Sequence, residues 1–283
     1  MIHSGRRHSI TIAGSKLCYW VYGPTLGAPV IIAIHGFRGT HHGLERVIQK
    51  LPQYTIIAPD LPGFGESSPM IDQRHDIDGY VQLFRKFIPK VTRPDEPVYL
   101  LGHSFGSIVA AKLVGEGLIH FNGLILINPI ATRPQIVGRL GSVFYFWLGH
   151  HLGEDRARTY FSWPHAINMM SLTLTKTRHQ PTKDYIKAQH LAHFSQYSNR
   201  QTLHESFKAS VTHTVGEHAA NITIPTLLIV GDRDEIAPLK SQQRLYSAIQ
   251  APTELAIVER TGHLLHYEKS TEAADFIRAF IGN

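Results

Sequence analysis

Cysteine is almost absent from this sequence: Cys18 is the only one among its 283 residues. A single thiol cannot form a disulfide within the chain, which excludes a small disulfide-stapled fold. The count fits a reducing compartment, and we predict a cytoplasmic protein.

Long apolar runs are also missing. The most hydrophobic stretch, residues 143–148, is far shorter than the roughly 20 residues that a membrane-spanning helix needs. Residues 1–20 alternate polar and apolar side chains, which predicts a strand rather than a signal peptide. We therefore expect no transmembrane segment.

The charged residues, 18% of the chain with a formal net charge of +6, form no basic run, so we predict no nucleic-acid partner. No G-x-G-x-x-G motif or phosphate-loop lysine occurs, so we predict no nucleotide cofactor. The histidine pairs lack an H-E-x-x-H arrangement or a cysteine partner, and we predict no metal. These pairs are His41-His42, His150-His151 and His190/His193.

Apolar runs alternate with helical patterns, which predicts an α/β fold with a mostly parallel, doubly wound sheet of about eight strands. The predicted strands are His8–Ala13, Lys16–Tyr22, Pro29–Ile34, Tyr54–Ala58, Val98–Leu101, Gly123–Ile127, Thr226–Val230 and Glu254–Val258. The predicted helices are Gly43–Leu51, Ile77–Pro89, Phe105–Leu118, Leu239–Ile249 and Thr271–Ile281.

The alternation breaks once, after the sixth strand. Residues 129–221 show helical patterns without a clear strand and are too long for a plain loop. We predict a core domain made of residues 1–128 and 222–283, with residues 129–221 as a helical insertion over one end of the sheet.

The strongest chemical signal is G-x-S-x-G around Ser104, between a predicted strand and a predicted helix. The serine of this motif sits at a strained, sharp turn, and side chains at Gly102 or Gly106 would collide with the neighbouring strand or helix. The pattern predicts that Ser104 is a nucleophile exposed at the carboxyl edge of the sheet.

A serine nucleophile needs a base, and the base needs a carboxylate. His263 follows Gly262 in the loop after the last strand, and His266 competes with it three residues later. The candidate acids are Asp232, Asp234 and Glu235, which follow the strand Thr226–Val230. The chain order Ser104, Asp234, His263 suits this kind of site. The end of the preceding strand, Asn128-Pro129, has no carboxylate.

Acyl transfer also needs donors for an oxyanion. The N–H of Phe105, which follows the nucleophile, is one candidate. The second comes from the loop that begins at His35-Gly36, where Gly36 gives room to turn inward and the N–H of Phe37 is our choice.

These motifs resemble those of the α/β-hydrolase superfamily over nearly the whole chain, apart from the insertion. The resemblance implies that Asp234 is the acid, that Asp60 has a structural role, and that the insertion is a cap (lid) over the pocket. Ser107 departs from the pattern, since many relatives have glycine there. The matching segments are His35-Gly36, Asp60–Ser67, Gly102–Gly106, Gly231–Asp234 and Gly262-His263.

The predicted activity is hydrolysis of a small or medium-sized carboxylic ester through an acyl-enzyme on Ser104, with a small ester-like molecule as partner. Alternatives are hydrolysis of a carbon–carbon bond in a vinylogous diketone, acyl transfer to another acceptor, perhydrolysis, and ligand binding without turnover. The insertion's aromatic stretch, Phe144, Phe146, Trp147 and Leu148, either lines an acyl pocket, seals the cap, or makes transient contact with lipid.

Overall fold

Eight strands form one sheet in the order β1-β2-β4-β3-β5-β6-β7-β8. The computed structural model describes residues 4–133 and 136–282, so the predicted domain ends at residues 1 and 283 lie outside the described residues. The strands are β1 Arg6–Ile12, β2 Ser15–Tyr22, β3 Val30–Ile34, β4 Thr55–Pro59, β5 Val98–His103, β6 Gly123–Ile127, β7 Thr226–Gly231 and β8 Thr253–Val258.

The sheet is parallel from β4 to β8, whereas β2 runs antiparallel to both β1 and β4. Every residue of β3 and β6 is buried, as expected for strands that are covered on both faces and rich in Ile and Leu. The prediction of an α/β fold with about eight mostly parallel strands is confirmed.

Helices cover both faces of this sheet. One apolar layer joins the sheet to α2, α3 and α9, and a second layer joins it to α1 and α11. The bounds are α1 Glu45–Ile48, α2 Ile77–Val91, α3 Phe105–Gly115, α9 Leu239–Ala248, α10 Leu265–Glu268 and α11 Ser270–Gly282.

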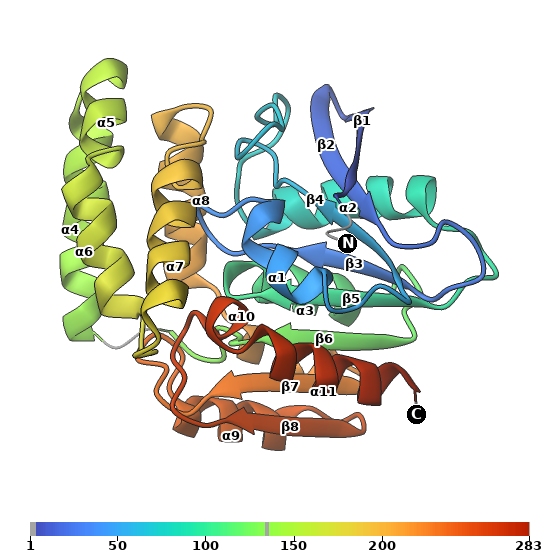
Figure 1. Cartoon of the computed structure of the whole chain (residues 1–283). Helices are drawn as coiled ribbons and strands as arrows, with labels where there is room; N and C mark the ends of the chain where they lie inside the picture. Colours follow the sequence, from blue (N-terminus) through green and yellow to red (C-terminus); the bar gives the residue numbers. More distant parts are fainter. Residues whose placement is uncertain (1–3, 134–135, 283) are drawn as a thin grey trace.

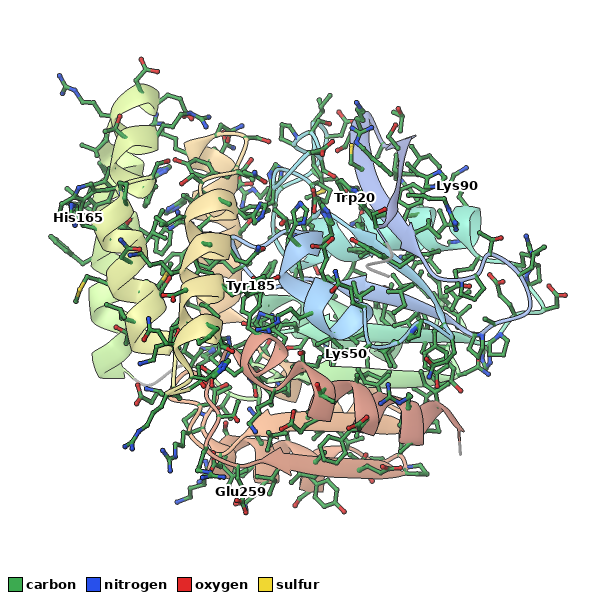
Figure 2. All side chains as sticks on the ribbon, in the orientation of Figure 1. Trp20, Lys50, Lys90, His165, Tyr185 and Glu259 are labelled. Atoms are coloured by element: carbon green, nitrogen blue, oxygen red, sulfur yellow. The ribbon has the colours of Figure 1, made fainter. Side chains whose placement is uncertain are left out.

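Between β6 and β7, the described residues form five helices, which stand side by side beyond the carboxyl end of β7, at the left of Figure 1. Two 3-10 turns, η2 Val215–Glu217 and η3 Ala219–Asn221, then lead back to β7. Figure 2 shows Tyr185 on the side of this insertion that faces the core, and His165 on its outer side. The five helices are α4 Ile136–His151, α5 Glu154–Phe161, α6 Pro164–Leu174, α7 Gln180–His193 and α8 Arg200–Thr212.

The predicted helix Gly43–Leu51 is shorter in the structure. A 3-10 turn, η1 His41–Leu44, leads into α1, which ends at Ile48. Pro52 disfavours helical backbone at the residue before it, and this limits the helix at its carboxyl end. In the described part of the chain, no helix is long and apolar enough to cross a bilayer.

We expect the centre of the sheet to dominate stability. Ile32 in β3 is fully buried, and truncation to alanine should cost about 2–5 kcal/mol of unfolding free energy. Ile257 in β8 is 42% exposed, so Ile257→Ala should cost less than about 1 kcal/mol. Urea unfolding of both variants measures the difference, and equal losses would contradict this account of the core.

Candidate active site

Ser104 lies in the tight turn between β5 and α3. Its φ of 51° and ψ of −118° place it in a backbone region that costs a non-glycine residue about 1–3 kcal/mol. The neighbours leave no room for side chains: a Cβ at Gly102 would lie 2.6 Å from the Gly106 oxygen, and one at Gly106 would lie 2.4 Å from the Ile34 oxygen. Close packing of α3 on β3 and β5 therefore holds the turn in place.

Ser107, the departure from the family pattern, takes part in this turn. Its hydroxyl donates to the Ser104 carbonyl and accepts from the N–H of Ile130 at 3.2 Å. A glycine would offer neither hydrogen bond. Ser107 thus connects the nucleophile turn to the chain that leaves β6.

The structure brings Ser104, His263 and Asp234 together. His263 Nε2 lies 2.8 Å from Ser104 Oγ, and His263 Nδ1 lies 2.7 Å from Asp234 Oδ2. An ionised carboxylate can only accept, so Nδ1 carries the proton and Nε2 accepts from the serine hydroxyl. This is the tautomer in which an imidazole can take the proton of Ser104.

Asp234 is the carboxylate that contacts His263. Its Oδ1 accepts from the N–H groups of Ile236 and Ala237 at 2.8 and 2.9 Å. Burial alone would raise the pKa of Asp234, but the electrostatic attraction and hydrogen bond of the His263 imidazole, with these two N–H groups, bring it below its usual value.

The competing residues point elsewhere. Asp232 accepts from the N–H of Thr261 at 3.0 Å, and Glu235 is exposed and binds Lys176 Nζ at 2.8 Å. His266, the competitor of His263, is buried with its ring 3.9 Å from that of His103, measured between centroids.

Asn128 has a role that the sequence reasoning missed. Its side-chain N–H groups donate to the carbonyls of Gly262 and His263, both at 3.0 Å, and its Oδ1 accepts from the N–H of Gly231 at 2.9 Å. Asn128 is fully buried and has a positive φ of 43°. It therefore fixes the loop that carries His263 against the ends of β6 and β7. The feature of the sequence that could have indicated this role is a single asparagine directly after a buried strand.

The loop after β3 carries His35, Gly36 and Phe37 to the same edge. His35 Nε2 accepts from the N–H of Leu61 at 2.8 Å, so its Nδ1 carries the proton and donates to the Gly36 carbonyl at 2.8 Å. Gly36 lies tightly against the nucleophile turn, since a Cβ there would be 3.3 Å from Ser104 Cβ. His35 thus holds the loop of Phe37 beside Ser104.

Asp60 supports this region from the end of β4. Its carboxylate accepts from the N–H and Nδ1–H of His41 at 2.8 and 2.9 Å, and from the N–H of Glu66 at 2.9 Å. Burial by itself would raise the pKa of Asp60, whereas the hydrogen bond and charge of His41 lower it overall. The carboxylate joins the start of η1 to the turn at 63–66.

Arg38 connects the loop after β3 to the inserted helices. Its guanidinium is buried and donates to the carbonyls of Phe161 at 2.8 Å and Phe194 at 2.8 and 3.0 Å. These carbonyls lie at the carboxyl ends of α5 and α7, where the helix dipole favours a cation. The residue next to Phe37 is therefore tied to the insertion.

A cavity of about 460 Å³ opens beside Ser104, between the sheet edge and the insertion. Both Phe37 and Phe105 lie in its wall, as do His103 and His263. Most of the remaining wall is apolar and comes from the inserted helices and from the loops after β6 and β7: Ile130, Phe146, Met170, Leu174, Phe207, Val211 and Ile236.

The aromatic stretch of the insertion divides between two environments. Phe146 is buried in the cavity wall, with its ring centroid 3.9 Å from that of Phe207 and 5.5 Å from that of Phe37. Phe144 and Trp147 are 61% and 50% exposed. Phe146 therefore both lines the cavity and packs the insertion onto the core.

One histidine pair approaches a metal-binding arrangement. Among the described residues, His41, His42 and Glu45 form the group whose potential ligand atoms all lie within 4.8 Å of one another. His41 Nδ1 donates to Asp60, and His42 Nδ1 donates to Glu45 at 3.0 Å. Both Nδ1 atoms therefore already form hydrogen bonds to carboxylates of the protein, those of Asp60 and Glu45.

The family model described as serine aminopeptidase, S33, matches residues 28–270. Proline iminopeptidase PfmaB of Pestalotiopsis fici is 26% identical over 96% of this chain and 98% of its own length. Lipase 1 of Psychrobacter immobilis is 29% identical over 96% of this chain and 83% of its own length.

A solved structure shows the same fold. The esterase EaEST of Exiguobacterium antarcticum superposes with a TM-score of 0.77 at 18% identity, covering 99% of this chain and all of that one. The match extends over the inserted helices as well as the sheet.

We predict that Asn128 positions the His263 loop. Asn128→Ala removes three hydrogen bonds that together contribute up to about 3 kcal/mol, at about 1 kcal/mol for each, and should slow acylation of Ser104 by about tenfold to 100-fold. Asn128→Asp should be slower still, because it places carboxylate oxygens against two carbonyls. The rate of labelling by a fluorophosphonate measures both variants. A labelling rate for Asn128→Asp equal to that of the unchanged protein would refute the positioning role.

We also predict a pH-dependent contribution of Asp234 to stability. Its pKa is lower in the folded chain than the ordinary 3.8, so the ionised form stabilises the fold at higher pH, and this is lost as pH falls through 3.8 and below. The unfolding free-energy difference between the unchanged protein and Asp234→Asn should shrink over that interval in urea titrations. Asp232→Asn, at a half-buried carboxylate that does not contact His263, should show a smaller change. A difference that grows on acidification would contradict the sign.

Proposed function

The chain belongs to the family described as serine aminopeptidase, S33, within the α/β-hydrolase superfamily, and on this premise we propose that it hydrolyses small or medium-sized carboxylic esters through an acyl-enzyme on Ser104. The observation that carries the proposal is the continuous hydrogen-bond chain from Ser104 through His263 to Asp234, at the wall of a cavity.

In the first step, Ser104 Oγ attacks the ester carbonyl while its proton passes to His263 Nε2. Asp234 holds Nδ1–H in place and stabilises the imidazolium that forms. The imidazolium then protonates the leaving alcohol, and the acyl group stays on Ser104.

The negative charge on the carbonyl oxygen needs fixed donors, each worth about 3 kcal/mol when removed. The N–H groups of Phe37 and Phe105 are our proposed donors, because both residues line the cavity beside Ser104. Phe105 begins α3, where the helix dipole also favours negative charge.

In the second step, water attacks the acyl group with His263 as the base. The proton on Nε2 then returns to Ser104 Oγ as the acid product leaves. No cofactor is needed for either step.

We propose that residues 129–221 act as a cap over this site. The support is that Phe146, Met170 and Phe207 of the insertion form part of the cavity wall. A cap of this kind restricts water around the acyl-enzyme and selects the substrate by shape. The cavity of about 460 Å³ suits a small or medium-sized ester.

The charges of the cavity favour an ester over a peptide with a free amino terminus. Arg38 places a buried cation in the wall, which would repel an ammonium group. The acidic residue of the wall, Glu235, is paired with Lys176. The names lipase and esterase among the similar proteins agree with this choice.

A fluorophosphonate and a series of p-nitrophenyl esters test the proposal. Ser104→Ala should abolish the adduct and turnover. Asp234→Asn should lower kcat by about 10⁴-fold through the wrong His263 tautomer, whereas Asp232→Asn should remain near the unchanged rate. Labelling that persists in Ser104→Ala would remove Ser104 as the nucleophile, and the reverse order of the two aspartate variants would move the acid to Asp232.

A further inference from the structure

The insertion exposes many large apolar side chains to solvent. Of the fourteen such side chains that are exposed within the described part of the chain, seven lie between positions 143 and 172. Two of the three tryptophans of the sequence are among them. The seven residues are Val143, Phe144, Trp147, Leu148, Trp163, Met169 and Leu172.

On α4 these side chains follow one face of the helix. Phe144, Trp147 and Leu148 are three and four residues apart, a spacing that places them on the same side. The rings of Phe144 and Trp147 stack with their centroids 6.0 Å apart. Phe146 points the other way, since it is buried against Phe207 of α8. The helix thus has an inner side in the cavity wall and an outer side in solvent.

The same division holds for α6. Met170 and Leu174 line the cavity, whereas Met169 and Leu172 are 64% and 66% exposed. His165 shares their exposed face, because it lies four and seven residues before them, and Figure 2 shows it at the outer edge of the insertion. This face of α6 therefore points away from the core.

These two helices belong to the outer layer of the insertion. α4 and α5 pack on α8, and α6 packs on α7, which itself contacts η1 and α10 of the core. Figure 1 accordingly shows α4, α5 and α6 farthest from the sheet. We call α4, α5 and α6 together the outer layer.

The insertion also holds nearly all of the net positive charge. The chain has 28 lysines and arginines and 22 aspartates and glutamates; residues 129–221 contain ten and five of these, which leaves 18 and 17 for the rest. Arg156 on α5, Arg178 after α6 and Lys187 on α7 are exposed, and none of the three forms an ion pair with another described residue. The core is therefore almost neutral, and the insertion offers unpaired cations.

Exposed apolar side chains beside unpaired cations match an anionic lipid surface. Large apolar areas on a protein surface commonly mark an interaction site. Tryptophan is favoured at the boundary between hydrocarbon and headgroups, and lysine and arginine are attracted to anionic headgroups. A second copy of this chain would bring two positively charged insertions together, and like charges across an interface oppose association.

We propose that the outer layer of the insertion docks on an anionic phospholipid surface. The apolar side chains of α4 and α6 enter the headgroup region, while the exposed cations of the insertion meet the negative headgroups. For the exposed residues of the aromatic stretch, this assigns lipid contact among the three predicted roles. The inference goes beyond the proposed function and does not require it, because docking is a binding event in which Ser104 takes no part.

Vesicle flotation tests the docking. The protein should bind vesicles made of equal parts phosphatidylcholine and phosphatidylglycerol about tenfold or more tightly than vesicles of phosphatidylcholine alone. Added salt should weaken binding to the mixed vesicles, because it screens the charges. Binding to neither kind of vesicle, or equal binding to both, would overturn the proposal.

Tryptophan fluorescence locates the contact. Trp147 and Trp163 are 50% and 56% exposed, whereas Trp20 is buried in the core. Mixed vesicles with brominated acyl chains should therefore quench the emission of the unchanged protein. The double variant Trp147→Phe/Trp163→Phe keeps only Trp20 and should lose this quenching. Quenching that persists in the double variant would place the lipid contact elsewhere and contradict the proposal.

Two matched pairs of variants test the apolar and the charged part of the surface. Leu172→Ser should weaken binding to the mixed vesicles by about tenfold, whereas Leu118→Ser, at a leucine 60% exposed after α3, should not change it. Arg156→Glu should weaken binding by about fivefold or more, and Arg244→Glu, exposed on α9 of the core, should not. Equal losses within either pair would refute the assignment to the outer layer.

Sedimentation of the lipid-free protein addresses a second copy as the occupant. Leu172→Ser should leave the sedimentation coefficient unchanged. A dimer that this substitution dissociates would identify the surface as a contact between copies and overturn the lipid proposal. Thermal melting of Leu172→Ser and Arg156→Glu should match that of the unchanged protein, since both residues are exposed.

The docking surface and the esterase can fail separately. Ser104→Ala should bind the mixed vesicles as tightly as the unchanged protein. Leu172→Ser and Arg156→Glu should keep the rate on a water-soluble p-nitrophenyl ester. Vesicle binding without ester turnover would refute the proposed function and retain the docking surface, whereas ester turnover without vesicle binding would do the reverse.

Discussion

The close approach of α3 to β3 and β5 at Gly102 and Gly106 is the constraint on which the candidate site depends. Ser104 has a positive φ of 51°, and such backbone persists only where the surroundings over-determine it. Here the surroundings are backbone oxygens that a Cβ would meet at 2.4 and 2.6 Å. The buried sheet therefore supplies the energy that holds the hydroxyl at the carboxyl edge, beside the first N–H groups of α3.

The other groups of the site are held by buried polar side chains rather than by apolar packing. Asn128 fixes the loop of His263, His35 fixes the loop of Phe37, and Asp60 fixes the start of η1. Each makes several hydrogen bonds to groups in the loops that follow the strands, beyond the ladder of the sheet. These side chains extend the rigidity of the sheet into its loops.

Arg38 also holds the inserted helices against the loop after β3. Its guanidinium joins the carboxyl ends of α5 and α7 to the loop next to Phe37. The aromatic contacts of Phe146 with Phe37 and Phe207 add an apolar connection at the same place. A shift of the inserted helices would therefore move the proposed oxyanion donor, which couples the shape of the cavity to the chemistry at Ser104.

The sequence by itself determined the sheet, the place of the insertion and the tight turn at Ser104, because these features rest on local patterns: apolar runs, glycines beside the serine, and a break in strand–helix alternation. The sequence predicted His263 as the base and Asp234 as the acid, but it left His266, Asp232 and Glu235 as competitors. Residue spacing alone does not give the direction in which a side chain points. Only the tertiary structure decided which atoms meet. It also decided the roles of Asn128 and Arg38, because their hydrogen bonds join segments more than 100 residues apart in the chain.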